Sequence, residues 1–219
     1  MGDSLRGVTA APPARARRRL RPALLVIAAA VIGGCGSTSL DNTIDADKLK
    51  DMSRQGQLWV FDAENGIVVA LDRLDEARDE LYRILRELKV AERRIEAAEK
   101  RRKRLLVDVA EAWEKHLESL ERWARANVRV ERFGVLVARA TVELAKAQVI
   151  QREDLLAGKD FDVKTYQEQY QELREEYLRR KKIVRKMRQR ARKLEARWRS
   201  LRRRYVAQTG DYDSGLWID

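Results

Sequence analysis

Residues that build most active sites are scarce in this chain of 219 residues. It has one cysteine, one histidine and three prolines. It also lacks a glycine-rich phosphate loop and any spaced set of metal ligands. The single histidine, His116, stands between Lys115 and Leu117 within an apolar repeat, where a histidine is usually packed rather than reactive. We therefore expect no catalytic residue, no metal site and no cofactor, and we do not expect an enzyme.

Proline is also absent from the long stretch between Gly66 and Gly158, in which Gly134 is the only internal glycine. Apolar residues recur there in alternating steps of three and four, the pattern of a helix lying along another helix. The seam contains Leu71, Leu74, Leu81, Leu85, Leu88, Ile95, Leu106, Val109, Trp113, Leu120, Trp123, Val130, Val137 and Leu144. Residues such as Arg78, Glu92 and Glu99 interrupt it. We predict one continuous helix over 66–157, roughly 135 Å long, in a coiled coil.

A second apolar seam predicts a second helix over 163–207. Its members are Val163, Tyr166, Tyr170, Leu173, Tyr177, Val184, Met187, Ala191, Leu194, Trp198, Leu201 and Tyr205. In the connection 158–162, Gly158 suits the residue after a helix end and Asp162 suits an N-cap. Phe161 and Tyr166 have the spacing of a hydrophobic staple. So short a loop makes the two helices antiparallel, and the predicted fold class is all-α, a long antiparallel helical hairpin.

The length of this loop also predicts which residues face each other. We expect Trp198 near Leu120 and Trp123, and Tyr205 near Trp113. The second helix then covers only the distal half of the first and leaves the seam Leu71–Ile95 without an intramolecular partner. An exposed apolar stripe of that length usually marks an interface. We therefore expect self-association or a partner helix along Leu71–Ile95.

The first 34 residues have the layout of a secretory signal. Six arginines and one acid precede the twelve uncharged residues Ala23–Gly34. Twelve residues of helix span about 18 Å, whereas a bilayer core is about 30 Å thick, so the segment is too short for a comfortable membrane span. It ends immediately before Cys35, the only cysteine of the chain.

The run Ile32-Gly33-Gly34-Cys35 resembles the lipobox of bacterial lipoproteins: an aliphatic residue and two small ones before a cysteine. The resemblance covers about residues 1–40. It implies that the signal 1–34 is cleaved and that Cys35 carries fatty acyl chains such as palmitate. The lipid would then anchor the chain at the periplasmic face of a membrane. Because Gly36 and Ser37 include no aspartate, the resemblance favours the outer membrane. The alternative is a buried or free structural cysteine.

Three shorter segments complete the predicted organisation. Residues 35–47 comprise the lipidated cysteine and a small, polar, flexible tether. Residues 48–65 are predicted to form a short, weakly determined helix or turn. The acidic segment 208–219 is predicted to be a loose C-terminal tail.

Positive charge dominates the second helix, in a chain whose formal net charge is +12. Residues 179–205 hold fifteen Lys or Arg and one acid, whereas 62–99 hold eleven acids and seven cations. Four arginines outside the seam are our candidate contacts with an anionic partner: Arg188, Arg192, Arg199 and Arg203. The partners we consider are peptidoglycan, anionic lipid and the acidic segment of a second copy, and the alternative is a solvated face. A basic face also suits nucleic acid, but the predicted periplasmic location argues against it.

These features predict a membrane-anchored, periplasmic coiled-coil lipoprotein with a structural or scaffolding role in the cell envelope. One alternative is an accessory subunit of an export or secretion machine, and another is an anionic-polymer binding module. Leu155–Leu173 resembles the Gly-x-x-x-Asp-Val connection in helical hairpins of outer-membrane efflux proteins. The chain lacks the repeat and the barrel strands of that family, so we interpret the match as convergence on a good helix turn.

Overall fold

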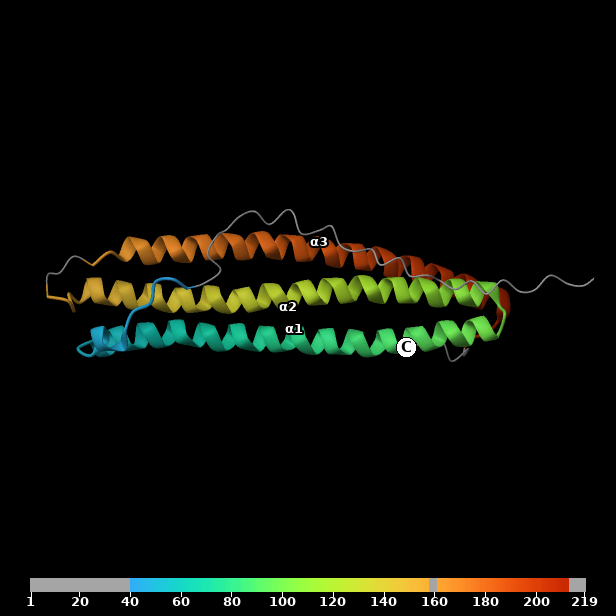
Figure 1. Ribbon diagram of the computed structural model, residues 1–219, viewed down its shortest axis with the longest axis horizontal. Coiled ribbons are helices and arrows are strands. Elements are labelled where there is room, and N and C mark those ends of the chain that lie inside the picture. Colours follow the sequence, from blue (N-terminus) through green and yellow to red (C-terminus); the bar gives the residue numbers. More distant parts are fainter. Residues whose placement is uncertain (1–39, 158–160, 213–219) are drawn as a thin grey trace, which may run out of the picture. The chain divides into compact units, whose positions relative to one another are not determined.

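Three long antiparallel helices form most of the part of the chain that the structure describes. This computed structural model describes residues 40–157 and 161–212, which belong to one compact unit, Ser37–Asp219. A short 3-10 helix, η1 (Ala46–Leu49), precedes α1 (Arg54–Lys100), α2 (Arg104–Arg152) and α3 (Val163–Thr209). Helix α2 contacts both other helices and lies between them (Figure 1). The predicted all-α fold of antiparallel helices is confirmed.

The described residues include no β-strand. Within the same ranges, no helix combines the length and the apolar character that a membrane span needs.

The prediction of one continuous helix over 66–157 is wrong, because the chain reverses direction at residues 101–103. Arg102 has a positive φ of 53°. This left-handed conformation costs a residue with a side chain about 1–2 kcal/mol. The turn contains neither glycine nor proline, so nothing in the sequence marks it. It allows α1 to fold onto α2 and bury an apolar face, and this burial outweighs the local strain.

The buried face of α1 shares one of its two rows with the predicted seam, and its other row lies one residue before the predicted positions. Two heptad-spaced rows form it: Leu74, Leu81, Leu88 and Ile95 in one row, and Ala77, Ile84, Ala91 and Ala98 in the other. Ile84, Ala91 and Ala98 have no exposed surface. The predicted interruptions Arg78, Glu92 and Glu99 each follow a member of the second row and are exposed.

The prediction that Leu71–Ile95 lacks an intramolecular partner is therefore wrong. Helix α2 covers the buried face of α1, and its Trp113 and Leu117 share an apolar cluster with Ala91. The small alanine side chains let the two backbones approach closely. Leu71 itself lies outside the buried face and is 43% exposed.

The seam predicted for α3 is confirmed, with Leu173, Val184, Ala191 and Tyr205 as its buried members. The predicted register against α2 is wrong by one to two turns. Trp198 stacks on Trp113 with ring centroids 6.3 Å apart, and Tyr205 lies in a cluster with Leu106 and Val109. The cause is that α2 ends at Arg152 rather than at 157, which lengthens the connection.

The signals predicted at the start of α3 are confirmed. The Asp162 carboxylate is the N-cap and accepts hydrogen bonds from the Lys164 N–H at 3.0 Å and from the Thr165 hydroxyl. The rings of Phe161 and Tyr166 stack with centroids 5.7 Å apart. Gly158, predicted to follow the helix end, lies outside the described residues.

Residues 40–53, which we name the strap, lie against the helices. Leu40 contacts the cluster that contains Phe133 and Leu173, and Ile44 is buried in a cluster with Ala147 and Ile150. The prediction of a flexible tether over 35–47 is therefore wrong for residues 40–47. It failed because a short polar sequence does not reveal that the helices hold its backbone.

The weakly determined segment predicted over 48–65 is also wrong in its second half, because α1 begins at Arg54. The Ser53 hydroxyl caps this helix by accepting a hydrogen bond from the Gly56 N–H at 3.1 Å. The N–H and hydroxyl of Ser53 donate to the two carboxylate oxygens of Glu153, at 2.8 and 2.5 Å. These bonds hold the pKa of the Glu153 carboxyl below its usual range. They also join the start of α1 to the end of α2.

Candidate functional site

The four candidate arginines lie along one flank of α3. Arg188, Arg192, Arg199 and Arg203 are spaced by four, seven and four residues, so the helix places them in one row beside its buried seam. All four are exposed. The row has the right layout to contact an extended anionic surface.

Two of these arginines already have partners within the bundle. The Arg188 guanidinium lies over the Trp123 ring, 4.6 Å from its centroid, and Arg199 forms an ion pair with Glu195 at 2.6 Å. Within the described ranges, Arg192 and Arg203 have no ion pair or ring partner. Arg192 and Arg203 are therefore the members of the row that are free to bind an external anion.

The charges divide along the length of the bundle. The first turns of α1 lie beside Glu153, and α1 residues 62–80 hold seven acids and two cations. The basic segment 179–204 of α3 extends toward the turn at 101–103, since Tyr205 and Ala98 share a cluster. The bundle is therefore acidic where the strap joins α1 and basic at the opposite end.

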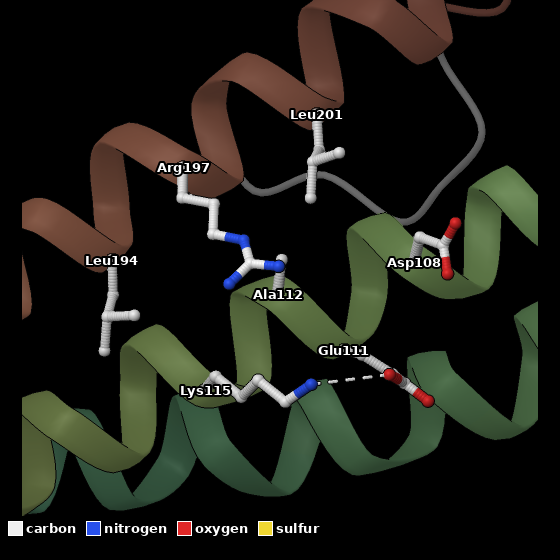
Figure 2. A pocket seen from close by; sticks show the side chains of 7 residues that line it. All are labelled: Asp108, Glu111, Ala112, Lys115, Leu194, Arg197 and Leu201. Atoms are coloured by element: carbon white, nitrogen blue, oxygen red, sulfur yellow. Dashed lines mark ion pairs between the residues drawn. The ribbon is translucent and has the colours of Figure 1, made fainter.

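A groove between α2 and α3 is the second candidate site, with a volume of about 260 Å³. Its lining comprises Asp108, Glu111, Ala112, Lys115, Leu194, Arg197 and Leu201 (Figure 2). Lys115 and Glu111 form an ion pair at 3.5 Å across one helical turn. The groove is smaller than most ligand pockets, which span about 300–1,000 Å³. Its two acids and two cations give it no preference for one sign of charge.

His116 has a structural environment. Its Nδ1 lies 3.0 Å from the Ala191 carbonyl oxygen, to which it donates as the neutral Nδ1–H tautomer. Its ring is parallel to that of Trp198, with centroids 6.4 Å apart. Burial lowers the pKa of His116 below its ordinary value. In the described ranges, no group of three His, Cys, Asp or Glu side chains could hold a metal ion.

Two polar residues that the sequence did not single out hold the strap. The Gln169 side-chain oxygen accepts from the Asp41 and Asn42 N–H groups at 3.0 and 2.9 Å, and its amide donates to the Asn42 carbonyl at 3.2 Å. The buried Glu143 accepts from the Ile44 N–H at 2.6 Å. Apolar periodicity cannot find such residues, because their partners come from a distant segment of the chain.

Cys35, the predicted lipidation site, lies outside the described residues. Leu40, the first described residue, follows it by five positions. Five extended residues reach at most about 18 Å.

Comparisons of this chain with protein-family models, with curated proteins and with solved structures give no match.

Proposed function

We propose that this protein is a lipid-anchored lipoprotein of the bacterial periplasm, with a structural or scaffolding role in the cell envelope. The observation that carries the proposal is the run Ile32–Cys35 behind a basic segment and twelve uncharged residues. A signal of this kind delivers the chain across the inner membrane and leaves the acylated Cys35 as its new amino terminus. The absence of aspartate at Gly36 and Ser37 favours the outer membrane.

The strap supports a mechanical role for this anchor. Leu40 and Ile44 are packed on the helices, and Asn42 is held by Gln169. A lipid on Cys35 would therefore hold the bundle within about 18 Å of the bilayer surface, whereas a long flexible linker would let it move further away. A helix as long as α2, with 49 residues, extends about 74 Å at 1.5 Å per residue. A rigid rod of that length suits a spacer or scaffold.

Substitution of Cys35 tests the anchor. In bacteria fed a palmitate analogue, the wild-type chain should take the label and fractionate with membranes. Cys35→Ala should lose both properties, whereas Ser37→Ala should keep them because it leaves the lipobox intact. An unlabelled wild-type chain, together with a Cys35→Ala chain that remains in the membrane fraction, would overturn the lipoprotein assignment.

The scaffolding role predicts a separate result in living cells. Cells that carry only Cys35→Ala should show the envelope defects of a deletion strain, such as sensitivity to detergent, although the bundle itself still folds. Full rescue of the deletion by the released chain would show that attachment is not needed for the function.

Binding of an anionic polymer is a second candidate function, favoured by exposed Arg192 and Arg203. Arg192→Gln with Arg203→Gln should weaken retention on peptidoglycan sacculi or anionic vesicles, since glutamine keeps helix propensity and removes charge. Binding should also fall between 0.1 and 1 M salt, where the Debye length shrinks from about 10 to 3 Å. The control is Arg73→Gln with Arg86→Gln, two exposed arginines on α1. Equal losses in both variants would mean that only net charge matters.

A further inference from the structure

Helix α1 has an apolar and acidic face that points away from α2. Leu58, Phe61 and Val68 are each more than half exposed, at 57, 57 and 56%. Their spacing places them on one side of the helix, opposite the buried Leu74 and Ala77. Asp72, Glu76 and Asp79 continue this side toward the middle of α1 and are exposed. We name these six residues the outer face of α1.

Helix α3 has an exposed face that is apolar at one end and basic further along. Leu178 is 53% exposed and lies on the side opposite the buried Val184 and Leu173. Lys182, Arg185 and Lys186 follow on the same side and are exposed. We name Leu178, Lys182, Arg185 and Lys186 the outer face of α3.

The charges of both faces are available for a partner. Asp72, Glu76 and Asp79 form no ion pair within the described ranges, and the same holds for Lys182, Arg185 and Lys186. The charged residues of each face all have the same sign, so they cannot form ion pairs with one another. The two faces lie on different helices of one chain, and α2 lies between these two helices (Figure 1).

Three residues of each face match in spacing when the helices run in the same direction. The same sequence spacing separates Val68 from Leu178, Asp72 from Lys182, and Glu76 from Lys186. An apolar contact would thus be followed by two opposite-charge contacts, each one helical turn further along. An antiparallel arrangement about the same Val68–Leu178 contact would place Asp72 opposite Arg174 and Glu76 opposite Tyr170, so it keeps one opposite-charge contact instead of two.

The fold already gives α1 and α3 this common direction, because each is antiparallel to α2. Ala98 of α1 and Tyr205 of α3 share one cluster, and so do Ile84 and Val184. Counted from these two pairs, Val68 lies about three to ten residues, or roughly 5–15 Å, from the height of Leu178. Two parallel copies therefore need an axial shift of about one to three turns to bring the two faces into register.

We propose that the outer face of α1 in one copy binds the outer face of α3 in a second, parallel copy. Because the two surfaces differ, the contact is heterologous and leaves an unused face at each end, so copies add into rows or rings. This inference goes beyond the proposed anchor and does not require it. The parallel arrangement is nevertheless the one that copies anchored through Cys35 in one membrane leaflet would need.

The contact is weak in solution and sensitive to salt. Exposed ion pairs stabilise a contact only weakly, so the charges chiefly select the register, and the apolar residues add a modest contribution. Attachment to one membrane raises the effective concentration of copies and favours such weak contacts.

Cysteine crosslinking of the full chain tests the contact. No Cα atom of α1 lies within 8 Å of a Cα atom of α3 in the described ranges, and a disulfide needs Cα atoms closer than about 7 Å. A disulfide between Val68→Cys and Leu178→Cys must therefore join two chains. We expect a ladder of dimers and larger species on a non-reducing gel.

Two controls accompany this pair. Ala196 is exposed and lies eighteen residues after Leu178. Eighteen residues make five helical turns, so Ala196 is on the same side of α3 as Leu178 and about 27 Å further along the helix. Val68→Cys with Ala196→Cys should give no ladder, and neither should the parent chain with Cys35 alone. A ladder from the Ala196 pair, or none from the Leu178 pair, would overturn the proposed register.

Exchanging the charges tests whether the opposite-charge contacts hold the two copies together. In the crosslinking chain, Lys182→Glu with Lys186→Glu should abolish the ladder, and adding Asp72→Lys with Glu76→Lys should restore it. Helical content measured by circular dichroism should stay constant, because all four side chains are exposed. A ladder that survives the first reversal, or that the second fails to restore, refutes the charge matching.

A last variant distinguishes the lateral contact from the proposed lipid anchor. It is the crosslinking chain with the added substitution Cys35→Ser, purified and tested in low salt. We expect a ladder there at high protein concentration. It would show that the lateral contact stands even if lipidation fails, whereas its absence at every concentration in solution and in cells would refute the contact itself.

Discussion

Ala91 is completely buried where α1 meets Trp113 and Leu117 of α2, whereas the next residue, Glu92, is exposed. A leucine at position 91 would have to displace these neighbours. Because overpacking a dense core typically costs 1–3 kcal/mol, we expect Ala91→Leu to lower the free energy of unfolding by roughly that amount. Urea unfolding followed by circular dichroism measures it.

Glu92→Leu is the matched control, since it introduces the same side chain one position away. It should change the free energy of unfolding by less than about 0.5 kcal/mol, the usual range for surface substitutions. Equal effects of the two substitutions would contradict the observed orientation of α1.

His116 gives the bundle a dependence on pH. Burial lowers its pKa in the folded chain, so the unfolded chain, with a pKa near 6.5, binds the proton more readily. The stability associated with the neutral ring is complete above pH about 6.5 and decreases as the pH falls toward the folded pKa. We expect the free energy of unfolding to decline over this interval.

His116→Gln isolates this contribution, because His116 is the only histidine of the chain. The variant will be less stable at every pH, since it loses the stack on Trp198. Its difference from the wild type should nevertheless become smaller as the pH falls below 6.5. A constant difference between pH 7.5 and 5.5 would contradict the buried, neutral state of His116.

At the scale of elements, the turn at 101–103 decides whether the chain forms two helices or three. Arg102 is in the left-handed region with a φ of 53°, whereas Arg101 is right-handed with a φ of −73°. Glycine adopts the left-handed conformation without strain, so Arg102→Gly should raise the free energy of unfolding by about 1 kcal/mol. Thermal and urea unfolding check this gain.

Arg101→Gly provides the comparison at the neighbouring position. It should lower the free energy of unfolding by roughly 0.5–1 kcal/mol, because it adds freedom to the unfolded chain without relieving strain. If both glycine variants were destabilised to the same extent, the turn would not have the conformation described.

The elements that the sequence predicts well depend on local signals. Asp162 caps α3 through an N–H only two residues away, and the apolar rhythm of α3 continues from Val163 to Tyr205. In α1, by contrast, Ala77, Ala91 and Ala98 are three of the four residues in one buried row. Alanine is compatible with both a core and a surface, so leucine spacing placed this row one residue too far along the chain.

The elements that the sequence does not reveal depend on distant partners. The strap is polar and short, and it is ordered by partners more than ninety residues away, among them Gln169 and Glu143. The reversal at Arg102 likewise depends on the burial that α1 gains against α2. The row of candidate arginines on α3 could be predicted from helical spacing, but the engagement of Arg188 with Trp123 could not.

At the scale of the whole molecule, the bundle is acidic near the strap and basic toward the turn at 101–103. If the chain is anchored as proposed, a lipid on Cys35 is at most about 18 Å from Leu40, because five residues separate the two positions.

The mass of the mature chain tests this anchoring most directly. Protein purified from bacterial membranes with detergent, without any substitution, can be weighed intact and its amino-terminal peptide sequenced by mass spectrometry. We predict a chain that begins at Cys35, lacks residues 1–34, and carries the mass of fatty acyl groups on its first residue. A mature chain that retains residues before Cys35, or that begins at an unmodified Cys35, would contradict the lipoprotein assignment.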